Sequence, residues 1–426
     1  MRALSIHSLP DELLVAIAVA GQEDRVTDLY RPGRWRSDYT TFKCEWIWSR
    51  LSQRFHSVIV GAPDLWTLIE TDFSGERSNE ILKLYLERSR ERQISVTLRQ
   101  PPGSNMLDEG DLEERVTGGI VPQINRIRWL RIMLGPTDLD PEMLAPFRDV
   151  AAPCLQHLEI IFRNDMRTTR ALFLSGAPRL SCLKMAGISL RLPVPVWTAT
   201  LTHLEYSGPN IHNLAAITAQ CPLLTHLHLR VAYVAPDATR FHVPTLSFLH
   251  ISIPDGAADY LELLVDLFDS PALTELIVYG SDGAQIALLL SLKTLLHSSF
   301  PSLTSLTFLT DSCPCETWGS NRPSYPISCP PGVFPALSHL TLINQCYTEH
   351  LIQEILGPAS QLWPLLKVIT LGIKNDSFGS VRDAVEDAMI SKRQRGEPLP
   401  KIRLLRAPAS LEDWSEDISF DAGMSW

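Results

Sequence analysis

The feature that most constrains this chain is a recurring pattern, Pro-x-[Leu/Ile]-x-x-[Leu/Ile]-x-apolar. It reads PCLQHLEI from Pro153, and weaker copies start at Pro122 and Pro400. A copy without proline includes Leu201, Leu204 and Tyr206. The other full copies start at Pro178, Pro222, Pro244, Pro271, Pro301, Pro335 and Pro364. A period of about 20 to 36 residues is typical of arrays in which each copy forms one supersecondary unit.

Each copy predicts a short β-strand. Alternate apolar residues, such as Leu158 and Ile160, would point into the core, and the proline would lie at the strand start, where its missing N–H costs least. Helix-like stretches separate several copies, at 259–268, 284–297 and 349–356. Strands alternating with helices at this spacing predict an α/β fold with parallel strands stacked into a solenoid.

With these motifs, residues 119–408 resemble leucine-rich-repeat proteins. The asparagine that usually follows the strand is mostly absent, since Arg163 and Ile188 occupy that position in two copies. The resemblance therefore implies an irregular leucine-rich-repeat solenoid. A conventional α/β domain with leucine-rich buried strands is the alternative, because its apolar pattern is similar.

The N-terminal stretch SLPDELLVAIAVAG, at 8–21, has features of both a signal peptide and a helix. Arg2 and the Ala-Val-Ala ending suit a cleavage site. Asp11 and Glu12 do not, and the apolar core of Leu13 to Ala20 is short. Acidic residues after Pro10 favour the first turn of a helix, so we expect a helix here, with a secreted repeat protein as the alternative.

Three motifs follow one another in the first 70 residues: LPDELL from Leu9, WIWSRLSQRF from Trp46, and APDLW from Ala62. Their order resembles the F-box motif of fungal type, interrupted by a polar, basic insertion at 22–41. The resemblance implies a helical module that docks a Skp-family adaptor and, through it, a cullin ubiquitin ligase. Some of the docking candidates would instead belong to the module's core. The candidates are Leu9, Pro10, Leu13, Ile17, Leu51, Phe55 and Trp66.

Residues 71–118 are expected to link this module to the solenoid and to cap it. A helix over Ser78 to Arg90 and a strand over Ile94 to Leu98 fit that role, followed by a loop at 100–118. At the other end, residues 409–426 read as an acidic tail.

The repeat also predicts a binding surface for a protein substrate. Residues on either side of the second leucine of each copy would point away from the core, onto the concave face of the sheet. Six of the twelve histidines fall in this strip. They are compatible with a metal site at His226, His228 and His250, with a ligand-contacting patch, or with no special role. The substrate-binding candidates are Arg126, Arg128, His157, His203, Glu205, His226, His228 and His250.

Composition excludes several functions. A net charge of −10 makes non-specific nucleic-acid binding a poor hypothesis, and no apolar run is long enough to predict a membrane span. Eight cysteines in 426 residues are too dilute for a disulfide framework and indicate a reducing compartment, so we expect the cytoplasm, the nucleus or both. Cys313, Cys315 and Cys329 lie together, but no fourth zinc ligand is evident.

Catalytic signatures are missing from the sequence, which contains no G-x-S-x-G, P-loop, dinucleotide fingerprint or H-E-x-x-H motif. We therefore expect a substrate-recognition adaptor, with no enzymatic activity and no cofactor. The alternative is a repeat scaffold for protein interactions that are unconnected with ubiquitin.

Overall fold

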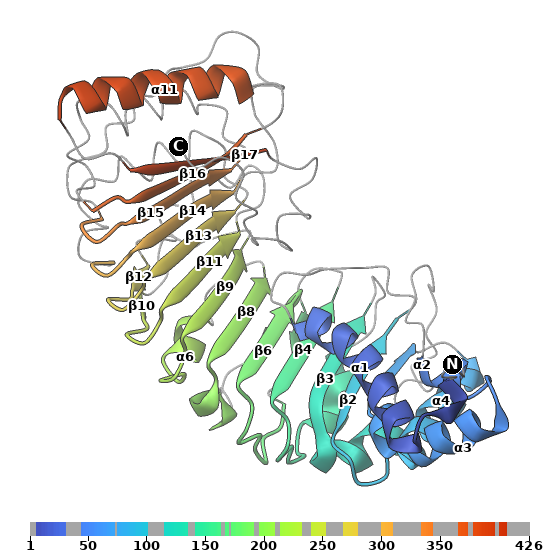
Figure 1. Ribbon diagram of the computed structural model, residues 1–426. Helices are drawn as coiled ribbons and strands as arrows, with labels where there is room; N and C mark the ends of the chain where they lie inside the picture. The colour runs from blue at the N-terminus through green and yellow to red at the C-terminus, as the bar shows by residue number, and fades with distance from the viewer. Residues whose placement is uncertain are drawn as a thin grey trace, which may run out of the picture. The chain divides into compact units, whose positions relative to one another are not determined.

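A computed structural model gives the fold, and Figure 1 shows its helices and strands. It describes residues 6–30, 44–72, 75–100, 115–134, 141–162, 167–169, 172–190, 196–208, 214–231, 240–252, 267–279, 300–309, 334–343, 365–373, 378–396 and 400–406. The chain forms two compact units, Met1–Trp197 and Thr198–Trp426. Each unit is described by itself below.

The first unit combines N-terminal helices with five parallel strands in the order β1-β2-β3-β4-β6. Its helices are α1 (Asp11–Tyr30), α2 (Cys44–Trp48), α3 (Gln53–Gly61) and α4 (Gly75–Arg88). The strands are β1 (Leu68–Asp72), β2 (Ile94–Arg99), β3 (Ile127–Leu134), β4 (His157–Phe162) and β6 (Cys182–Ala186), with a small ladder of β5 (Arg167–Thr169) and β7 (Ile188–Leu190). Short helical turns are η1 (Ile6–Ser8), η2 (Pro63–Trp66), η3 (Arg115–Ile120), η4 (Val121–Arg126), η5 (Pro141–Phe147) and η6 (Val196–Thr200), the last of which begins in this unit and ends in the next.

The second unit has eight parallel strands in the order β8-β9-β11-β13-β14-β15-β16-β17. They are β8 (His203–Gly208), β9 (His226–Val231), β11 (Phe248–Ser252), β13 (Glu275–Tyr279), β14 (Ser305–Leu309), β15 (His339–Ile343), β16 (Val368–Ile373) and β17 (Lys401–Arg406). The remaining elements are α6 (Leu214–Thr218), α11 (Phe378–Gln394) and a short ladder of β10 (Phe241–His242) and β12 (Phe268–Asp269).

All eleven copies of the sequence pattern correspond to strands, so the predicted parallel-strand α/β architecture is confirmed. The sheet begins before the first copy of the pattern, which forms β3. Strand β1 pairs with β2, and β2 pairs with β3. Helix α4 and strand β2 match the two elements predicted at 78–90 and 94–98. The helices predicted at 259–268, 284–297 and 349–356 lie almost wholly outside the described residues, as do Cys313, Cys315, Cys329 and the 409–426 tail.

The repeated proline does not start a strand, contrary to the sequence prediction. It lies in a β-turn that precedes the strand, and the leucine two residues later donates its N–H to the carbonyl of the residue before the proline. In the copy at Pro271, Leu273 bonds in this way to Ser270 at 3.0 Å. Proline suits the second position of such a turn because its φ is already fixed there and its N–H is not needed. The same turn closes at Pro153, Pro178, Pro222, Pro244, Pro301 and Pro335.

A ladder of hydroxyl groups supports the strand starts. The Thr274 hydroxyl donates to the carbonyl of Ser247 at 3.0 Å, and the Thr304 hydroxyl donates to the carbonyl of Thr274 at 3.0 Å. The backbone N–H of each of these threonines bonds to the same carbonyl as its hydroxyl. These bonds tie neighbouring copies of the pattern together at the starts of their strands. Further members are Ser181, Thr225, Ser247 and Ser338.

The core of each unit consists of the inward side chains of the strands and the leucines of the preceding turns. In β13, for example, Leu276 and Val278 have no exposed surface, and neither has Leu273 in the turn before it. Residues between them, such as Ile277, are partly exposed on the opposite face. The alternation fixes the register of each strand, since a shift by one residue would expose the core. We call the face opposite to this core the outward face.

Candidate functional site

Helix α1 has two distinct apolar faces. Leu14 and Ala18 are buried, and one turn later Gln22 is buried as well. Leu13 and Ile17 point away from that face and are 49% and 45% exposed. The spacing of four residues within each set places its members on one side of the helix. The helix predicted at the N-terminus is confirmed, and it continues to Tyr30 through the first part of the predicted insertion. Residues 31–43 lie outside the described residues.

A buried polar cluster joins the N-terminal helices to α4. Gln22 donates from its side-chain amide to the Glu45 carboxylate and to the carbonyl of Leu65, both at 3.0 Å. The Tyr85 hydroxyl donates to the other oxygen of Glu45, and the Trp46 indole donates to that hydroxyl. Burial and the neighbouring Glu45 raise the pKa of Tyr85, so the phenol stays neutral and remains a donor. These bonds hold the helical module in one arrangement.

Two of the predicted docking residues belong to the core, and their assignment as partner contacts is wrong. Phe55 is fully buried and packs against Trp48, with ring centroids 5.8 Å apart. Trp66 is 1% exposed, donates to the carbonyl of Ile59 at 2.9 Å and packs edge-on against Tyr85. The motif pattern identifies these aromatic residues but does not distinguish an anchor of the fold from a contact with a partner.

The start of α1 is fastened by Arg54. Its guanidinium contacts the Asp11 carboxylate at 2.6 Å and the carbonyl of Leu9 at 2.6 Å. Leu9 itself is half-buried and Pro10 is exposed. The ion pair is exposed to solvent, so it positions the helix more than it stabilises the module.

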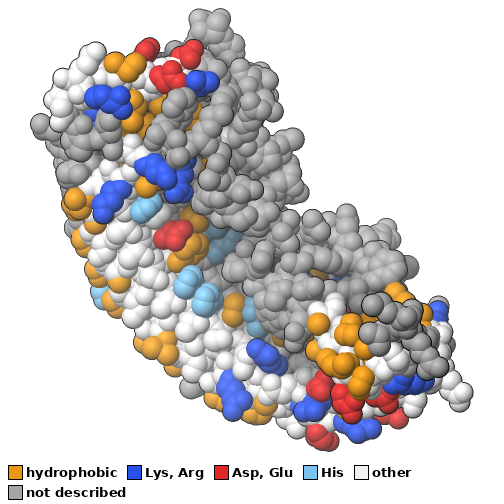
Figure 2. Space-filling model, in the orientation of Figure 1, with side chains coloured by type: hydrophobic (Ala, Val, Ile, Leu, Met, Phe, Trp, Pro, Cys, Tyr) orange, Lys and Arg blue, Asp and Glu red, His pale blue; other side chains and the backbone are white. Residues whose placement is uncertain are grey.

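The N-terminal helices carry a concentration of exposed apolar side chains. Figure 2 shows hydrophobic side chains gathered over them, next to acidic residues. Among the described residues nine large hydrophobic side chains are exposed, and five of the nine lie before residue 52. Patches of this kind on a folded surface mark sites for protein partners. We call this set the apolar surface: Ile6, Leu13, Ile17, Ile47 and Leu51.

On the first unit, the outward face carries compensated charges. Glu159 lies between Arg131, at 2.7 Å, and Lys184, at 3.5 Å. In the adjacent row His157 stacks on Trp129 with ring centroids 3.4 Å apart. His157 therefore lies on the predicted face.

Arg126 and Arg128 do not lie on the predicted strip, and this part of the prediction is wrong. The pairing of β2 with β3 shifts register after Ile94, which leaves Arg128 as an extra residue and makes Trp129 the next outward position. Arg128 is exposed and bonds to the side chain of Gln156. Arg126 precedes the strand and is 8% exposed. Its guanidinium donates to the side chains of Ser89 and Gln123 and to the carbonyls of Leu86, Arg90 and Arg92, so it closes the end of α4.

On the second unit, the five remaining candidates lie together on the outward face of β8, β9 and β11. Figure 2 shows histidine side chains over these strands. In the first row, His203 stacks on His226 with centroids 4.2 Å apart, and His226 stacks on Phe248 at 5.5 Å. In the second row, His228 lies 3.7 Å from Glu205 and stacks on His250.

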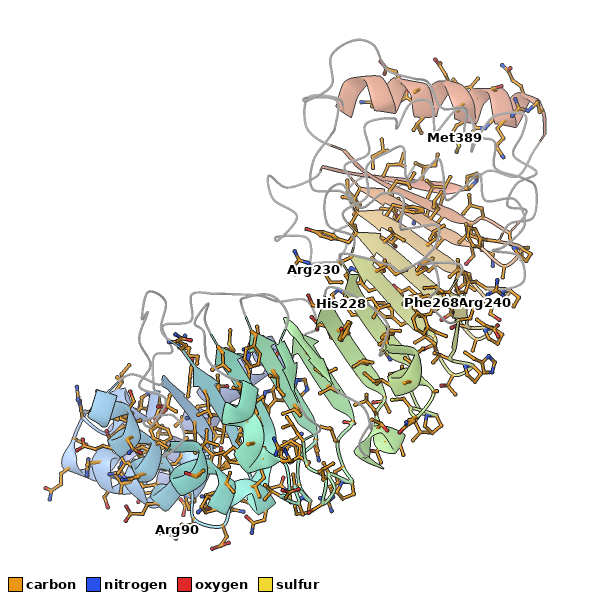
Figure 3. The ribbon with its side chains drawn as sticks, turned by 180° about the vertical axis from the view of Figure 1, so that it is seen from behind. Arg90, His228, Arg230, Arg240, Phe268 and Met389 are labelled. Carbon is orange, nitrogen blue, oxygen red and sulfur yellow. The ribbon has the colours of Figure 1, made fainter. Side chains whose placement is uncertain are left out.

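Burial controls the charge of this histidine cluster. It lowers the pKa of His250 to about 3, and the neighbouring His228 adds to the effect. Burial likewise lowers the pKa of His226, and burial with the charge of His226 lowers that of His203. These three rings are therefore neutral at neutral pH. His228 and Arg230 project from β9, as Figure 3 shows, while the neighbouring Leu227 and Leu229 are buried.

The three histidines considered as metal ligands do not converge on one point. His228 and His250 are parallel to within 3°, and the ring of His226 packs in the other row. Across the described part of the chain, no group of three or more His, Cys, Asp or Glu side chains is placed to hold a metal ion.

No helix among the described residues combines the length and apolar character needed to cross a bilayer.

Sequence reasoning missed the hydroxyl groups that position these histidines. The Thr225 hydroxyl lies 2.9 Å from Nδ1 of His226, and the Ser338 hydroxyl lies 2.8 Å from Nδ1 of His339. A serine or threonine three residues after the repeated proline is the signal in the sequence that would have found them.

No protein-family model matches the chain, and no curated protein is significantly similar to it.

Proposed function

We propose that this protein is the substrate-recognition adaptor of a ubiquitin ligase of the Skp–cullin–F-box type. The apolar surface on the N-terminal helices would bind a Skp-family adaptor, and the outward face of the strands would bind a protein substrate. The observation that carries the proposal is the exposure of Leu13, Ile17 and Leu51 within a module whose core is otherwise closed. Side chains of this kind supply the hot spots of helical interfaces.

The arrangement of the module supports this function. Leu14 and Ala18 face the core, so Leu13 and Ile17 remain available to a partner without unfolding the helix. The Arg54–Asp11 pair holds the start of α1 beside this surface. The strand face of the second unit consists of other residues, and we assign it to a different protein.

The test is a pull-down of the full chain with a purified Skp-family adaptor, compared with a Leu13→Asp, Ile17→Asp double variant. We expect the parent chain to bind and the double variant to lose binding while keeping its circular dichroism spectrum. A Leu365→Asp, Ile390→Asp variant is the matched control, since both residues are exposed leucine or isoleucine side chains of the second unit. A folded parent chain that does not bind the adaptor would overturn the ligase assignment and favour a repeat scaffold for other protein interactions.

A further inference from the structure

The hydrogen bonds at the start of β9 determine which ring nitrogen of His226 carries the hydrogen. The Thr225 hydroxyl donates its single hydrogen to the carbonyl of Thr202 at 3.2 Å. Toward Nδ1 of His226, 2.9 Å away, its oxygen can therefore only accept. The neutral ring thus carries its hydrogen on Nδ1, and Nε2 is a hydrogen-bond acceptor. Since His226 is exposed, this acceptor is available to a ligand.

The same arrangement recurs along the row. The Ser338 hydroxyl donates to the carbonyl of Thr304 at 3.1 Å and lies 2.8 Å from Nδ1 of His339. The Thr202 hydroxyl lies 2.9 Å from Nδ1 of His203. The donated hydroxyl hydrogen fixes Nε2 as the acceptor in His339 as it does in His226, and a hydroxyl also lies beside Nδ1 in His203.

The neighbouring positions have matching chemistry. Next to His226 in the register comes Phe248, and next to Phe248 comes Glu275. The first row of β8, β9, β11 and β13 thus presents the acceptor nitrogen of His226, the stacked imidazole of His203, an aromatic ring and a carboxylate. Glu205 adds a second carboxylate one row away. On the outward positions of these four strands the one permanent cation is Arg230, which lies in the third row.

We propose that the row His203, His226, Phe248 and Glu275 binds a lysine- and arginine-bearing segment of the substrate protein. Ammonium and guanidinium groups have hydrogen-bond donors only, so they complement imidazole acceptors and carboxylates, and they also pack on aromatic rings. An acidic segment would meet acceptors and like charges here. That the bound segment belongs to a ligase substrate rests on the proposed function. The chemistry of the site does not depend on that function.

Acid should weaken this binding. Protonation would turn the Nε2 acceptor of His226 into a donor, and protonation of either His203 or His226 would add positive charge beside the cationic segment. The ordinary charge state of the rings is neutral, because burial lowers the pKa of both His203 and His226. The titratable and charged groups that face His226 from β8, β9 and β11 are His203, Glu205, His228, Arg230 and His250.

The test measures binding of three labelled peptides to the purified full chain by fluorescence anisotropy. The peptides share a flexible Gly-Ser sequence and differ only in carrying Lys, Gln or Glu at the same positions. We expect the lysine peptide to bind roughly tenfold more tightly than the glutamine peptide at neutral pH, and the glutamate peptide to bind most weakly. Lowering the pH through the range in which these imidazoles and Glu275, whose pKa burial raises, take up protons should reduce the lysine preference.

Two double variants distinguish binding at this site from attraction of the peptide by the overall negative charge of the chain. His203→Asn, His226→Asn keeps an amide beside the threonine hydroxyls but removes both imidazoles and the Nε2 acceptor of His226, so the lysine preference should disappear. In His203→Gln, His226→Gln the side-chain oxygen replaces Nε2 and does not titrate, so binding should persist and lose the part of its pH dependence that comes from the imidazoles, while the part that comes from Glu275 remains. His242→Asn, at an exposed histidine paired with Asp269 on β10 and β12, is the control and should change nothing.

An asparagine variant that binds the lysine peptide like the parent chain would overturn the proposal, and so would equal binding of all three peptides. Because no ligase component is present, these results do not depend on docking at the apolar surface. A chain that fails to bind the Skp-family adaptor but discriminates the peptides would refute the ligase and keep the site.

Discussion

The imidazole of His250 lies face to face with that of His228 on the neighbouring strand, with ring centroids 3.9 Å apart and planes 3° from parallel. Nε2 of His250 is buried and makes no hydrogen bond with the described residues. A proton on His250 would therefore bring an unsolvated positive charge against the other ring. The native state favours two neutral rings, and its stability depends on pH for that reason.

The first prediction concerns this pH dependence. In the unfolded chain His250 has its usual pKa of 6.5, whereas in the folded chain the pKa is about 3. The unfolded chain therefore binds more protons below pH 6.5, and the free energy of unfolding should fall as the pH decreases from there toward 3. The loss for one such histidine is about 2 kcal/mol between about pH 8 and about pH 5. Guanidinium titrations across this range measure it.

The variant His250→Phe checks the source of the effect, because it keeps a flat ring beside His228 and removes the buried nitrogen. We expect a smaller pH slope than in the parent chain, whereas His242→Asn should keep the parent slope. Equal slopes for the parent and His250→Phe would show that other groups cause the acid sensitivity.

The hydroxyl ladder gives the second prediction. Thr274→Val keeps the shape of the side chain but removes its bond to the carbonyl of Ser247. The free energy of unfolding should fall by about 1 kcal/mol, the usual contribution of such a bond. Thr341→Val on the outward face of β15 is the control, since Thr341 has no part in the ladder. Urea denaturation followed by circular dichroism measures both, and equal effects would contradict a special role for the ladder.

The third prediction separates the two recurring residues of each turn, the proline and the leucine, in the copy at 270–273. Pro271→Ala should cost about 0.4–1 kcal/mol, because the proline acts mainly by restricting the unfolded chain. Leu273→Ala should cost about 2–5 kcal/mol, because Leu273 is fully buried and its truncation leaves a cavity. Denaturant titrations of both variants check the order, and a larger loss for the proline variant would refute this account of the turn.

The strands could be predicted from the sequence because each copy contains its own local signal. The apolar pair of each copy, such as Leu276 and Val278, fills the core of the same unit and needs no information from distant residues. The position of the proline was predicted less well. Its missing N–H was assigned to the strand start, although the same property also suits the turn in which it lies.

Buried and exposed side chains were harder to distinguish from the sequence in the N-terminal module. Leu13 and Leu14 are adjacent and chemically identical, yet one is exposed and the other is buried. The difference arises from tertiary packing of α1 against other elements, such as the bond from Gln22 to Leu65, which no local pattern contains. A register shift on β3 removed Arg128 from the predicted strip, and Arg126 precedes that strand; neither feature leaves a clear mark in the sequence.

The last prediction uses that adjacent pair to define the apolar surface. Leu14→Asp would place an unpaired carboxylate in the core, which costs several kcal/mol, so we expect it to unfold the N-terminal module. Leu13→Asp leaves the carboxylate in water and should change the free energy of unfolding by less than about 0.5 kcal/mol. Both substitutions add the same charge to the same turn of α1, so helix propensity and the helix dipole affect them alike. Hydrogen exchange of the α1 amides in the full chain distinguishes them: protection should persist in Leu13→Asp and disappear in Leu14→Asp. Loss of protection in Leu13→Asp would place Leu13 in the core, and the residue would then have to be removed from the proposed docking surface.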